Sequence, residues 1–194
     1  MAQDIKKIIA QEYLKCAKDP AYFMRKYCYI QHPKRGRILF NLYPFQEKVL
    51  HLFRDEQFII TLKSRQLGIS TLAAGHSLWL MLFHKDKNVL ALATTQATAR
   101  NLVTKTTFMY DELPKWLKLP AVEKNKLSLR LKNGSKIQAK SSNADAARSE
   151  AVSLLLIDEA AFIENIDETF AAAQQTLATG GQCMALSTPN GIGN

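Results

Sequence analysis

Short apolar runs alternate with longer amphipathic stretches through most of the chain. The short runs contain mainly Val, Leu, Ile and Ala, and their length is typical of strands. The longer stretches repeat apolar residues every three or four positions, which is the spacing of helices. The runs that predict strands are 58–62, 88–93, 152–157 and 184–187, and the stretches that predict helices are 70–84, 97–113 and 167–177. This alternation predicts an α/β fold, with a mainly parallel central sheet flanked by helices.

The first 40 residues have a different pattern, which predicts a helical N-terminal segment packed on the core. Apolar residues at helical spacing predict a helix over 3–18, which ends at Asp19-Pro20. The next expected elements are a short helix at 22–30, a basic loop at 32–37 and a short strand at 38–42. We therefore divide the chain into an N-terminal segment, residues 1–40, and a core, residues 41–194.

Two further elements belong to the predicted core. Pro44 suits the first turn of a helix, which we expect to run to about Phe53. Apolar and polar residues alternate over 127–131 and again over 137–139. Because Asn133-Gly134 between them is a typical turn sequence, we expect a β-hairpin at this point.

A polar loop joins the strand at 58–62 to the helix at 70–84. Strand, tight loop and helix form the context of a phosphate-binding loop, in which backbone N–H groups and the helix dipole point at one spot. Gly68 would let the backbone pass close to phosphates, and Ser70 stands where such a loop places its Mg²⁺-binding hydroxyl. The predicted nucleotide-binding residues of the loop are Lys63, Ser64, Arg65, Gln66, Leu67, Gly68, Ile69, Ser70 and Thr71.

The loop departs from the usual pattern G-x-x-x-x-G-K-[ST] at two positions. Counted from Gly68, Lys63 replaces the first glycine and Ile69 replaces the lysine. The β- and γ-phosphates of ATP still need a cation, and the loop contains Lys63 and Arg65. Because the loop doubles back, a lysine stem of roughly 6 Å can bring the Lys63 ammonium to the phosphates from the opposite limb. We therefore expect Lys63 to be the main phosphate cation, with Arg65 as the alternative.

Two carboxylates, Asp158 and Glu159, come directly after the apolar run 154–157. Paired acids beside a buried strand are costly, because burial desolvates them and like charges repel. Beside bound phosphates, the first carboxylate can hold Mg²⁺ and the second can orient and deprotonate an attacking water. We predict a metal site at Ser70 and Asp158 and a catalytic base at Glu159; the alternative is a strand that runs out into a solvated acidic loop.

Residues outside the loop offer further contacts to a nucleotide. Gln46 can bond both the N6 and N7 edges of adenine, and Tyr43 or Phe45 can stack on the base. Arg148 precedes the acidic strand, where a cation can stabilise γ-phosphate charge in the transition state, and we predict a catalytic role for it and for Arg65. The alternatives are core aromatic residues, a surface glutamine and a solvated arginine.

Charge is unevenly distributed along the chain. The net charge is +9, and residues 1–150 contain all 26 basic residues and 12 of the 17 acidic ones. An excess of this size favours a polyanionic partner rather than a phosphate site alone.

The three cysteines are scattered, which favours reduced thiols, and we find neither a membrane-spanning run nor the apolar part of a signal peptide. These features predict a cytoplasmic protein that does not enter a membrane.

Four motifs occur in the order Tyr-Pro-Phe-Gln, Ser-Arg-Gln-Leu-Gly, Leu-Leu-Ile-Asp-Glu-Ala-Ala-Phe-Ile and Ser-Thr-Pro-Asn-Gly. In this order, over about residues 40–194, the chain resembles the ATPase domain of the large terminase subunit, the DNA-packaging motor of tailed double-stranded DNA bacteriophages. The resemblance implies an ASCE-type, RecA-like P-loop NTPase fold. By this resemblance, Gln46 reads adenine, residues 63–70 form the Walker A loop, and Asp158 and Glu159 form the Walker B pair. Ser187 and Thr188 belong to the implied coupling motif. Arg148 is implied to act on the nucleotide of a neighbouring subunit. Ile69 departs from the many members that have lysine there, whereas Lys63 matches a variant with the lysine at the start of the loop.

The resemblance also implies an activity and partners. It implies an ATPase that uses ATP and Mg²⁺ to translocate double-stranded DNA into a procapsid, in the cytoplasm of the infected host cell. The implied partners are double-stranded DNA, the portal protein, the small terminase subunit and further copies of the chain in a ring. The family's C-terminal nuclease domain has no counterpart in the sequence, so we expect no nuclease site in these residues.

Two alternative functions remain open at this point. Superfamily-two helicases also have an adenine-reading glutamine and an Asp-Glu-Ala strand end, although Asp158-Glu159-Ala160-Ala161 lacks the Asp or His that usually completes their motif. The second alternative is a catalytically weak module that binds nucleotide or DNA, which Ile69 in the lysine position suggests. Duplex-stimulated hydrolysis without strand separation would distinguish the motor from both.

Overall fold

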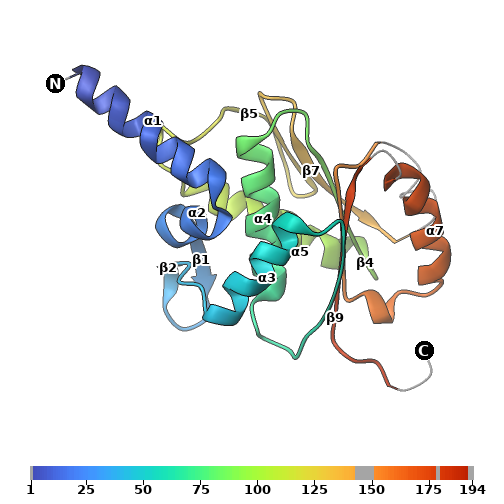
Figure 1. Ribbon diagram of the computed structural model, residues 1–194. Helices are drawn as coiled ribbons and strands as arrows, with labels where there is room; N and C mark the ends of the chain where they lie inside the picture. The colour runs from blue at the N-terminus through green and yellow to red at the C-terminus, as the bar shows by residue number, and fades with distance from the viewer. Residues whose placement is uncertain (1, 143–150, 178–179, 192–194) are drawn as a thin grey trace.

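The computed structural model describes residues 2–142, 151–177 and 180–191. A seven-stranded sheet with the order β3-β9-β8-β4-β7-β6-β5 forms its centre (Figure 1). The first five strands of this order are parallel, and β6 and β5 are antiparallel to their neighbours. The strands are β3 (Phe58–Leu62), β4 (Asn88–Ala93), β5 (Ala121–Lys124), β6 (Ser128–Leu131), β7 (Lys136–Ser141), β8 (Leu154–Asp158) and β9 (Gln182–Ser187). The predicted α/β fold with a mainly parallel sheet is confirmed.

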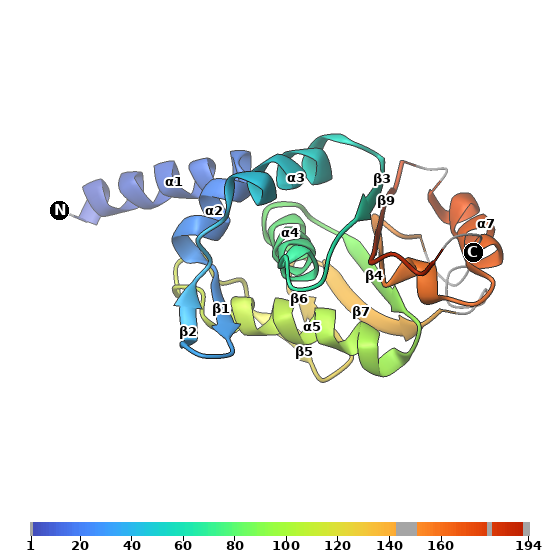
Figure 2. The same ribbon diagram turned by 90° about the horizontal axis from the view of Figure 1, so that it is seen from below.

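Helices cover both faces of the sheet. One face carries α3 (Pro44–Asp55), α4 (Ile69–Phe83) and α5 (Gln96–Asp111), and α7 (Ile166–Leu177) lies on the other (Figure 2). The α4 sequence contains no charged Asp, Glu, Lys or Arg, as a helix buried between neighbours requires. Successive strand residues face opposite layers: Leu156 packs in the core with α4, and Ile157 packs in the smaller core beside α7. The sheet is therefore buried on both sides around its central strands.

The predicted strands and helices of the core lie within two residues of their expected positions. The expected hairpin is also present, because β6 and β7 pair antiparallel. Its turn contains Gly134 at φ 84°, and the Asn133 side chain donates hydrogen bonds to the carbonyls of Met81 and His84. The turn sequence therefore also fastens the hairpin to the end of α4.

Several details of the sequence prediction are wrong. The strand expected at 38–42 lies at Gly36–Leu39, because its first residues pair in a hairpin. Residues 32–37 are not only a loop: β1 (Tyr29–His32) and β2 (Gly36–Leu39) form an antiparallel hairpin, and the helix before them, α2 (Pro20–Tyr27), ends earlier than expected. Gly36 adopts φ 66° in the turn, and the Arg37 guanidinium lies 3.9 Å from the centre of the Tyr29 ring. The edge strand β5 and the 3₁₀ turn η1 (Ala160–Phe162) were not predicted, since neither has buried residues that would give an apolar pattern.

The N-terminal helix α1 (Ala2–Lys18) projects from the rest of the molecule in both views (Figures 1 and 2). Of the α1 side chains that the structure describes, only Cys16, near the C-terminal end, is buried, and the Trp79 indole donates a 2.9 Å hydrogen bond to the Cys16 carbonyl. The Glu12 carboxylate accepts hydrogen bonds from Lys26, Tyr22 and Tyr27, and these bonds fasten α1 to α2. None of the described helices is long and apolar enough to cross a membrane.

Candidate nucleotide-binding site

The carboxyl ends of β3, β9 and β8 lie side by side, because these strands are parallel and adjacent in the sheet. The segments that follow them start from one edge, although they are far apart in the sequence. A backbone hydrogen bond of 2.9 Å from Lys63 N to Ser187 O joins two of these segments directly. The sheet therefore brings together three polar segments that follow strands, residues 63–71, 158–159 and 187–191.

The loop after β3 leads directly into α4. Gly68 is the N-cap of α4 and adopts φ 75°, a conformation that side chains disfavour. An added Cβ at Gly68 would also lie 2.8 Å from the side-chain nitrogen of Gln46, so glycine is needed here on two grounds. A cavity of about 600 Å³, the loop cavity, lies against the loop. Its lining includes every loop residue from 63 to 71, together with Asp158, Glu159 and Thr188.

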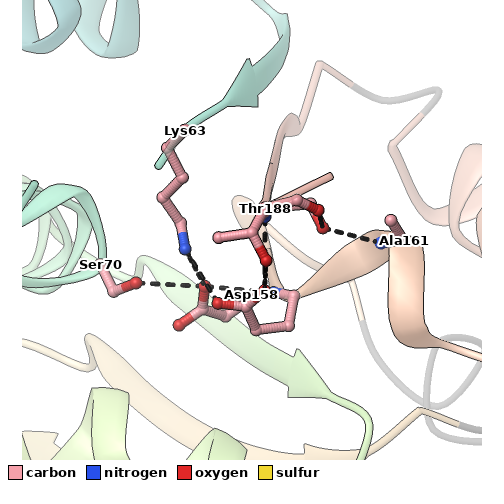
Figure 3. Close-up of polar contacts among 7 residues, drawn as sticks. Lys63, Ser70, Asp158, Ala161 and Thr188 are labelled. Atoms are coloured by element: carbon pink, nitrogen blue, oxygen red, sulfur yellow. Dashed lines mark hydrogen bonds and ion pairs between the residues drawn. The ribbon is translucent and has the colours of Figure 1, made fainter. Parts of the chain in front are cut away.

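Lys63 points from the end of β3 toward the two carboxylates (Figure 3). Its ammonium lies 2.9 Å from Glu159 Oε1 and 3.8 Å from Asp158 Oδ1, and only 8% of its side chain is exposed. Arg65 also lines the cavity, but it is exposed and makes no ion pair with a described residue. Of the two loop cations, Lys63 is thus the one held in place beside the acidic pair.

Ser70 and Asp158 form the second polar contact of the site. The Ser70 hydroxyl donates a 3.1 Å hydrogen bond to Asp158 Oδ1, which joins the first turn of α4 to the end of β8 (Figure 3). Mg²⁺ prefers oxygen ligands and keeps several waters, so a hydroxyl and a carboxylate side by side are suitable protein ligands. Among the described residues, no group of three or more His, Cys, Asp or Glu forms a dedicated metal cage.

Glu159 occupies a strained backbone position at the end of β8, with φ 54° and ψ 45°. Its Oε2 accepts a 3.1 Å hydrogen bond from the Thr188 hydroxyl and a longer one, of 3.4 Å, from the Thr188 backbone N–H. Burial by itself would raise the pKa of Glu159, but the hydrogen bonds from Lys63 and Thr188 and the charge of Lys63 lower it below the ordinary value. The carboxylate is therefore held in its ionised form, as a general base requires.

Ser187 and Thr188 join the end of β9 to the turn after β8. The Ser187 hydroxyl accepts a 3.0 Å hydrogen bond from the Ala161 backbone N–H and donates one of 2.9 Å to the Thr188 carbonyl. Thr188, which is 6% exposed, reaches Glu159 as described above. A change in the position of Glu159 would thus alter its hydrogen bonds with Thr188 at the end of β9.

Gln46 lies beside the loop rather than in the loop cavity. Its Nε2 donates a 2.9 Å hydrogen bond to the Leu67 carbonyl, and its Oε1 accepts a 3.0 Å bond from the Tyr43 backbone N–H. The residue is 2% exposed, so both of its amide groups are engaged inside the protein. Tyr43 is 64% exposed, and its ring stacks on Phe45 with 5.8 Å between ring centres. An adenine contact of Gln46 would require its covered amide to become accessible.

Comparison with known proteins identifies the family of the chain. The model of a protein family described as "Terminase large subunit, T4likevirus-type, N-terminal" matches residues 60–192, which is well over half of the chain. The chain belongs to the terminase large subunit family. The fold is accordingly the P-loop ATPase fold of these terminases, and the predicted family and fold class are confirmed.

Solved terminase structures share the fold at low sequence identity. The HK97 bacteriophage large terminase has a TM-score of 0.69 and 17% identity, and the match covers 89% of this chain and 37% of that one. The ATPase domain of the Thermus phage P74-26 large terminase has a TM-score of 0.60 and 20% identity, over 79% and 67% of the two chains. The large terminase of a thermophilic bacteriophage, solved in complex with ADP, has a TM-score of 0.59 and 16% identity, over 76% and 39%. The chain thus spans well under half the length of the HK97 terminase and of the ADP-bound terminase.

Helix α5 contributes a wall of the site that the sequence analysis missed. Thr98, Asn101 and Lys105 line the loop cavity from α5, and Thr94 lines it from the end of β4. The residues recur every three or four positions, the helical spacing of one face, but they are ordinary polar residues with no motif around them. Arg148, predicted to act on the γ-phosphate, lies outside the described residues.

Proposed function

We propose that this terminase chain hydrolyses ATP and uses the energy to translocate double-stranded DNA into a procapsid. The observation that carries the proposal is the contact of Lys63 with Glu159 at the edge of the loop cavity, with Ser70, Asp158 and Thr188 around it. A cation for phosphates, an oxygen pair for Mg²⁺ and a base for water stand within one site. Related terminases have been crystallised with ADP and with ATP-γ-S, which supports a nucleotide as the ligand.

Each residue has a distinct part in the proposed reaction. Backbone N–H groups at the start of α4 and the Lys63 ammonium bind the β- and γ-phosphates. Ser70 and Asp158 would hold Mg²⁺, and the ion would supply positive charge against the negative charge of the phosphate oxygens. Glu159 orients the attacking water and accepts its proton. Because Lys63 is paired with Glu159 before phosphates bind, its transfer to the phosphates would also release the base.

Thr188 is the proposed connection between hydrolysis and movement. Its hydroxyl bonds to the carboxylate that would act on water, and Ser187 beside it holds the turn after β8. A shift of Glu159 during hydrolysis would therefore displace the chain that follows β9. Arg148 is proposed to act on the nucleotide of a neighbouring copy in a ring, so activity is expected to depend on assembly.

The open face of β6 and β7 supports the proposal of a DNA partner. Leu129 and Ile137 point into the core, whereas the intervening residues of these strands are polar. A hollow of about 440 Å³ on this part of the sheet is lined by Arg130, Lys136 and Lys140 and by a single acidic residue, Glu123. A basic surface of this kind favours binding to a phosphate backbone without base readout. The portal protein, the small terminase subunit and the host cytoplasm are proposed from family membership.

The test is phosphate release from ATP with Mg²⁺, with and without linear double-stranded DNA, over a range of protein concentrations. We expect slow hydrolysis by the dilute chain, stimulation by DNA and a rate per chain that rises with concentration. A strand-displacement assay on the same samples should show no separation of strands, and separation would favour the helicase alternative. Tight ATP binding without turnover under every condition would contradict an ATPase and support a binding module.

A further inference from the structure

The chain after β9 holds the turn after β8 through both backbone groups of one residue, Ala161. The Ser187 hydroxyl accepts a 3.0 Å hydrogen bond from the Ala161 N–H (Figure 3), and the Asn190 side-chain amide donates one of 2.8 Å to the Ala161 carbonyl. Ala161 is the middle residue of η1, the 3₁₀ turn that directly follows Glu159. Ser187 belongs to the predicted coupling motif, whereas Asn190 had no predicted role.

Glu159 needs a hold from outside the turn, because its backbone is in an unfavourable conformation. Its φ of 54° and ψ of 45° lie in the left-handed region, which residues with a side chain disfavour. Such a conformation persists only where the surrounding structure over-determines it. The Glu159 backbone bonds to Asp158 Oδ1 at 3.1 Å and to the Phe162 N–H at 3.0 Å, but both partners belong to the same turn. The bonds of Ala161 are the ones that fix this turn relative to the end of β9.

The position of η1 matters to the site in two ways. The Glu159 carboxylate must meet the Thr188 hydroxyl, which lies 3.1 Å away on the segment after β9. Phe162, the last residue of η1, lines the loop cavity, so a shift of the turn would also move a wall of that cavity. Pro189 separates Thr188 from Asn190, and its ring limits the backbone freedom between these two contacts. One short segment thus holds both the side chain and the backbone turn of the proposed base.

We propose that Asn190 is a positioning residue for the general base. Its amide holds η1, and η1 holds Glu159 in the backbone conformation from which the carboxylate reaches the attacking water. This inference rests on the proposed ATPase function, in which Glu159 accepts a proton from that water. Asn190 does not line the loop cavity, so its substitution should affect hydrolysis and leave nucleotide binding unchanged.

The first experiment measures phosphate release from ATP with Mg²⁺ and linear double-stranded DNA, at the protein concentration that gives wild type its highest rate. Asn190→Ala should lower kcat roughly tenfold, the effect expected from one lost hydrogen bond that acts on the reaction, and should change the ATP affinity in titration calorimetry less than twofold. Asn190→Asp keeps the size but cannot donate to the Ala161 carbonyl, so its loss should be at least as large. Asn41→Ala, at an exposed asparagine outside the loop cavity, is the matched control.

The second experiment repeats Asn190→Ala in the Glu159→Gln chain and measures the residual hydrolysis. If Asn190 acts through the base, its loss should lower this residual rate less than twofold, because the base is already absent. A further tenfold loss in the Glu159→Gln chain would show an effect that is independent of Glu159 and would overturn the inference.

Other results would contradict the inference in distinguishable ways. Folded Asn190→Ala and Asn190→Asp chains with wild-type kcat would overturn it and leave the ATPase proposal intact. Normal hydrolysis by Asn190→Asp alone would assign the effect to packing and overturn it as well, as would a tenfold weaker ATP affinity of both variants. A wild-type chain without hydrolysis under any condition would overturn the proposed function and this inference with it. If Asn190→Ala fails to fold, as circular dichroism would show, the variant of equal size, Asn190→Asp, decides alone.

Discussion

Two cavities that share Thr71, Asn101 and Lys105 in their linings form the two ends of one groove. One end is the loop cavity, and the other is a cavity of about 300 Å³ between α5 and the β1–β2 hairpin, the α5–β1 cavity. At the loop cavity, polar side chains already contact one another: Lys63 bonds to Glu159, and Ser70 bonds to Asp158. At the α5–β1 cavity the walls are half apolar, and the side chains come from a helix and a separate hairpin. A highly charged triphosphate needs fixed charges and dipoles, which the loop cavity provides. Substitutions at the two ends should therefore have different effects on hydrolysis and on ligand binding.

The largest effect is expected from Glu159→Gln at the phosphate end. The amide keeps the shape of the carboxylate but cannot accept a proton, so hydrolysis should fall on the order of 10²-fold or more. ATP binding should be retained in titration calorimetry, since the phosphate contacts of the loop remain. Glu164→Gln is the matched control, because Glu164 is an exposed glutamate of the same segment outside the cavity. Near-normal turnover of the Glu159→Gln chain would place the base on another residue.

Lys63→Ala should have the next largest effect. Loss of one aimed charge at a transferring phosphoryl group should lower the rate of hydrolysis by roughly 10²–10³ in the assembled protein. Binding of ATP and of inorganic tripolyphosphate, which lacks the nucleoside, should both weaken, because the lost charge contacts the phosphate chain that the two ligands share. Lys85→Ala removes an exposed lysine just after α4 and serves as the control.

Arg65→Ala decides between the two loop cations. If it impairs hydrolysis more than Lys63→Ala does, Arg65 is the phosphate cation and Lys63 only holds the acidic pair. A lysine at position 69 is a poor rescue for Lys63→Ala, because Ile69 is 3% exposed and packs in the core. We therefore expect Ile69→Lys to lower the temperature of unfolding rather than restore activity, which thermal denaturation would measure.

Gln46→Ala should have a moderate effect and distinguishes the two ends of the groove most directly. Its bonds to the Leu67 carbonyl and the Tyr43 N–H hold the loop against α3. Loss of these bonds should weaken the binding of ATP and of tripolyphosphate by the same factor, roughly tenfold. It should also lower the free energy of unfolding by about 1–2 kcal/mol. Lys48→Ala, on the exposed side of α3, is the control for both measurements. A loss confined to ATP would instead make Gln46 a reader of the base.

The smallest effect concerns the dependence of stability on pH. The folded state lowers the pKa of Glu159 below the reference value of 4.5, mainly through Lys63 and Thr188 acting against burial. Its charged form therefore contributes stability above about pH 4.5, and this contribution is lost as the pH falls further and the carboxylate is protonated. Denaturant unfolding of wild type and Glu159→Gln at pH 7 and pH 3.5 measures the effect. The free energy of unfolding of wild type should exceed that of Glu159→Gln by less at pH 3.5 than at pH 7. A larger difference at pH 3.5 would contradict the Lys63–Glu159 pair.

Much of the fold and of the phosphate end follows from local sequence. An apolar strand such as 154–157 must be buried, and two carboxylates that follow it must then lie at the edge of the sheet. The loop between β3 and α4 can likewise be predicted from local sequence, because its glycine and hydroxyl residues have the spacing of a phosphate-binding loop. Because parallel strands all place their carboxyl ends at one edge, strand-end motifs meet without further information. The Lys63–Glu159 contact itself was not foreseen, because it depends on the distance between two strand ends.

The other end of the groove depends on tertiary structure alone. Asn101 and Lys105 are ordinary residues of a helix, and only the packing of α5 beside α4 brings them to the loop cavity. Gln31 lies in a hairpin whose pairing is set by Gly36 and by strand register, and the apolar pattern did not reveal it. Gln46 fits the adenine motif in sequence, yet the close approach of α3 to Gly68 engages its amide with the loop. The sequence by itself thus determined which residues have the chemistry for phosphates, because that chemistry lies at strand ends. Only the packing of helices and hairpin decided which polar and aromatic side chains share a cavity, because those contacts join segments with no common local pattern.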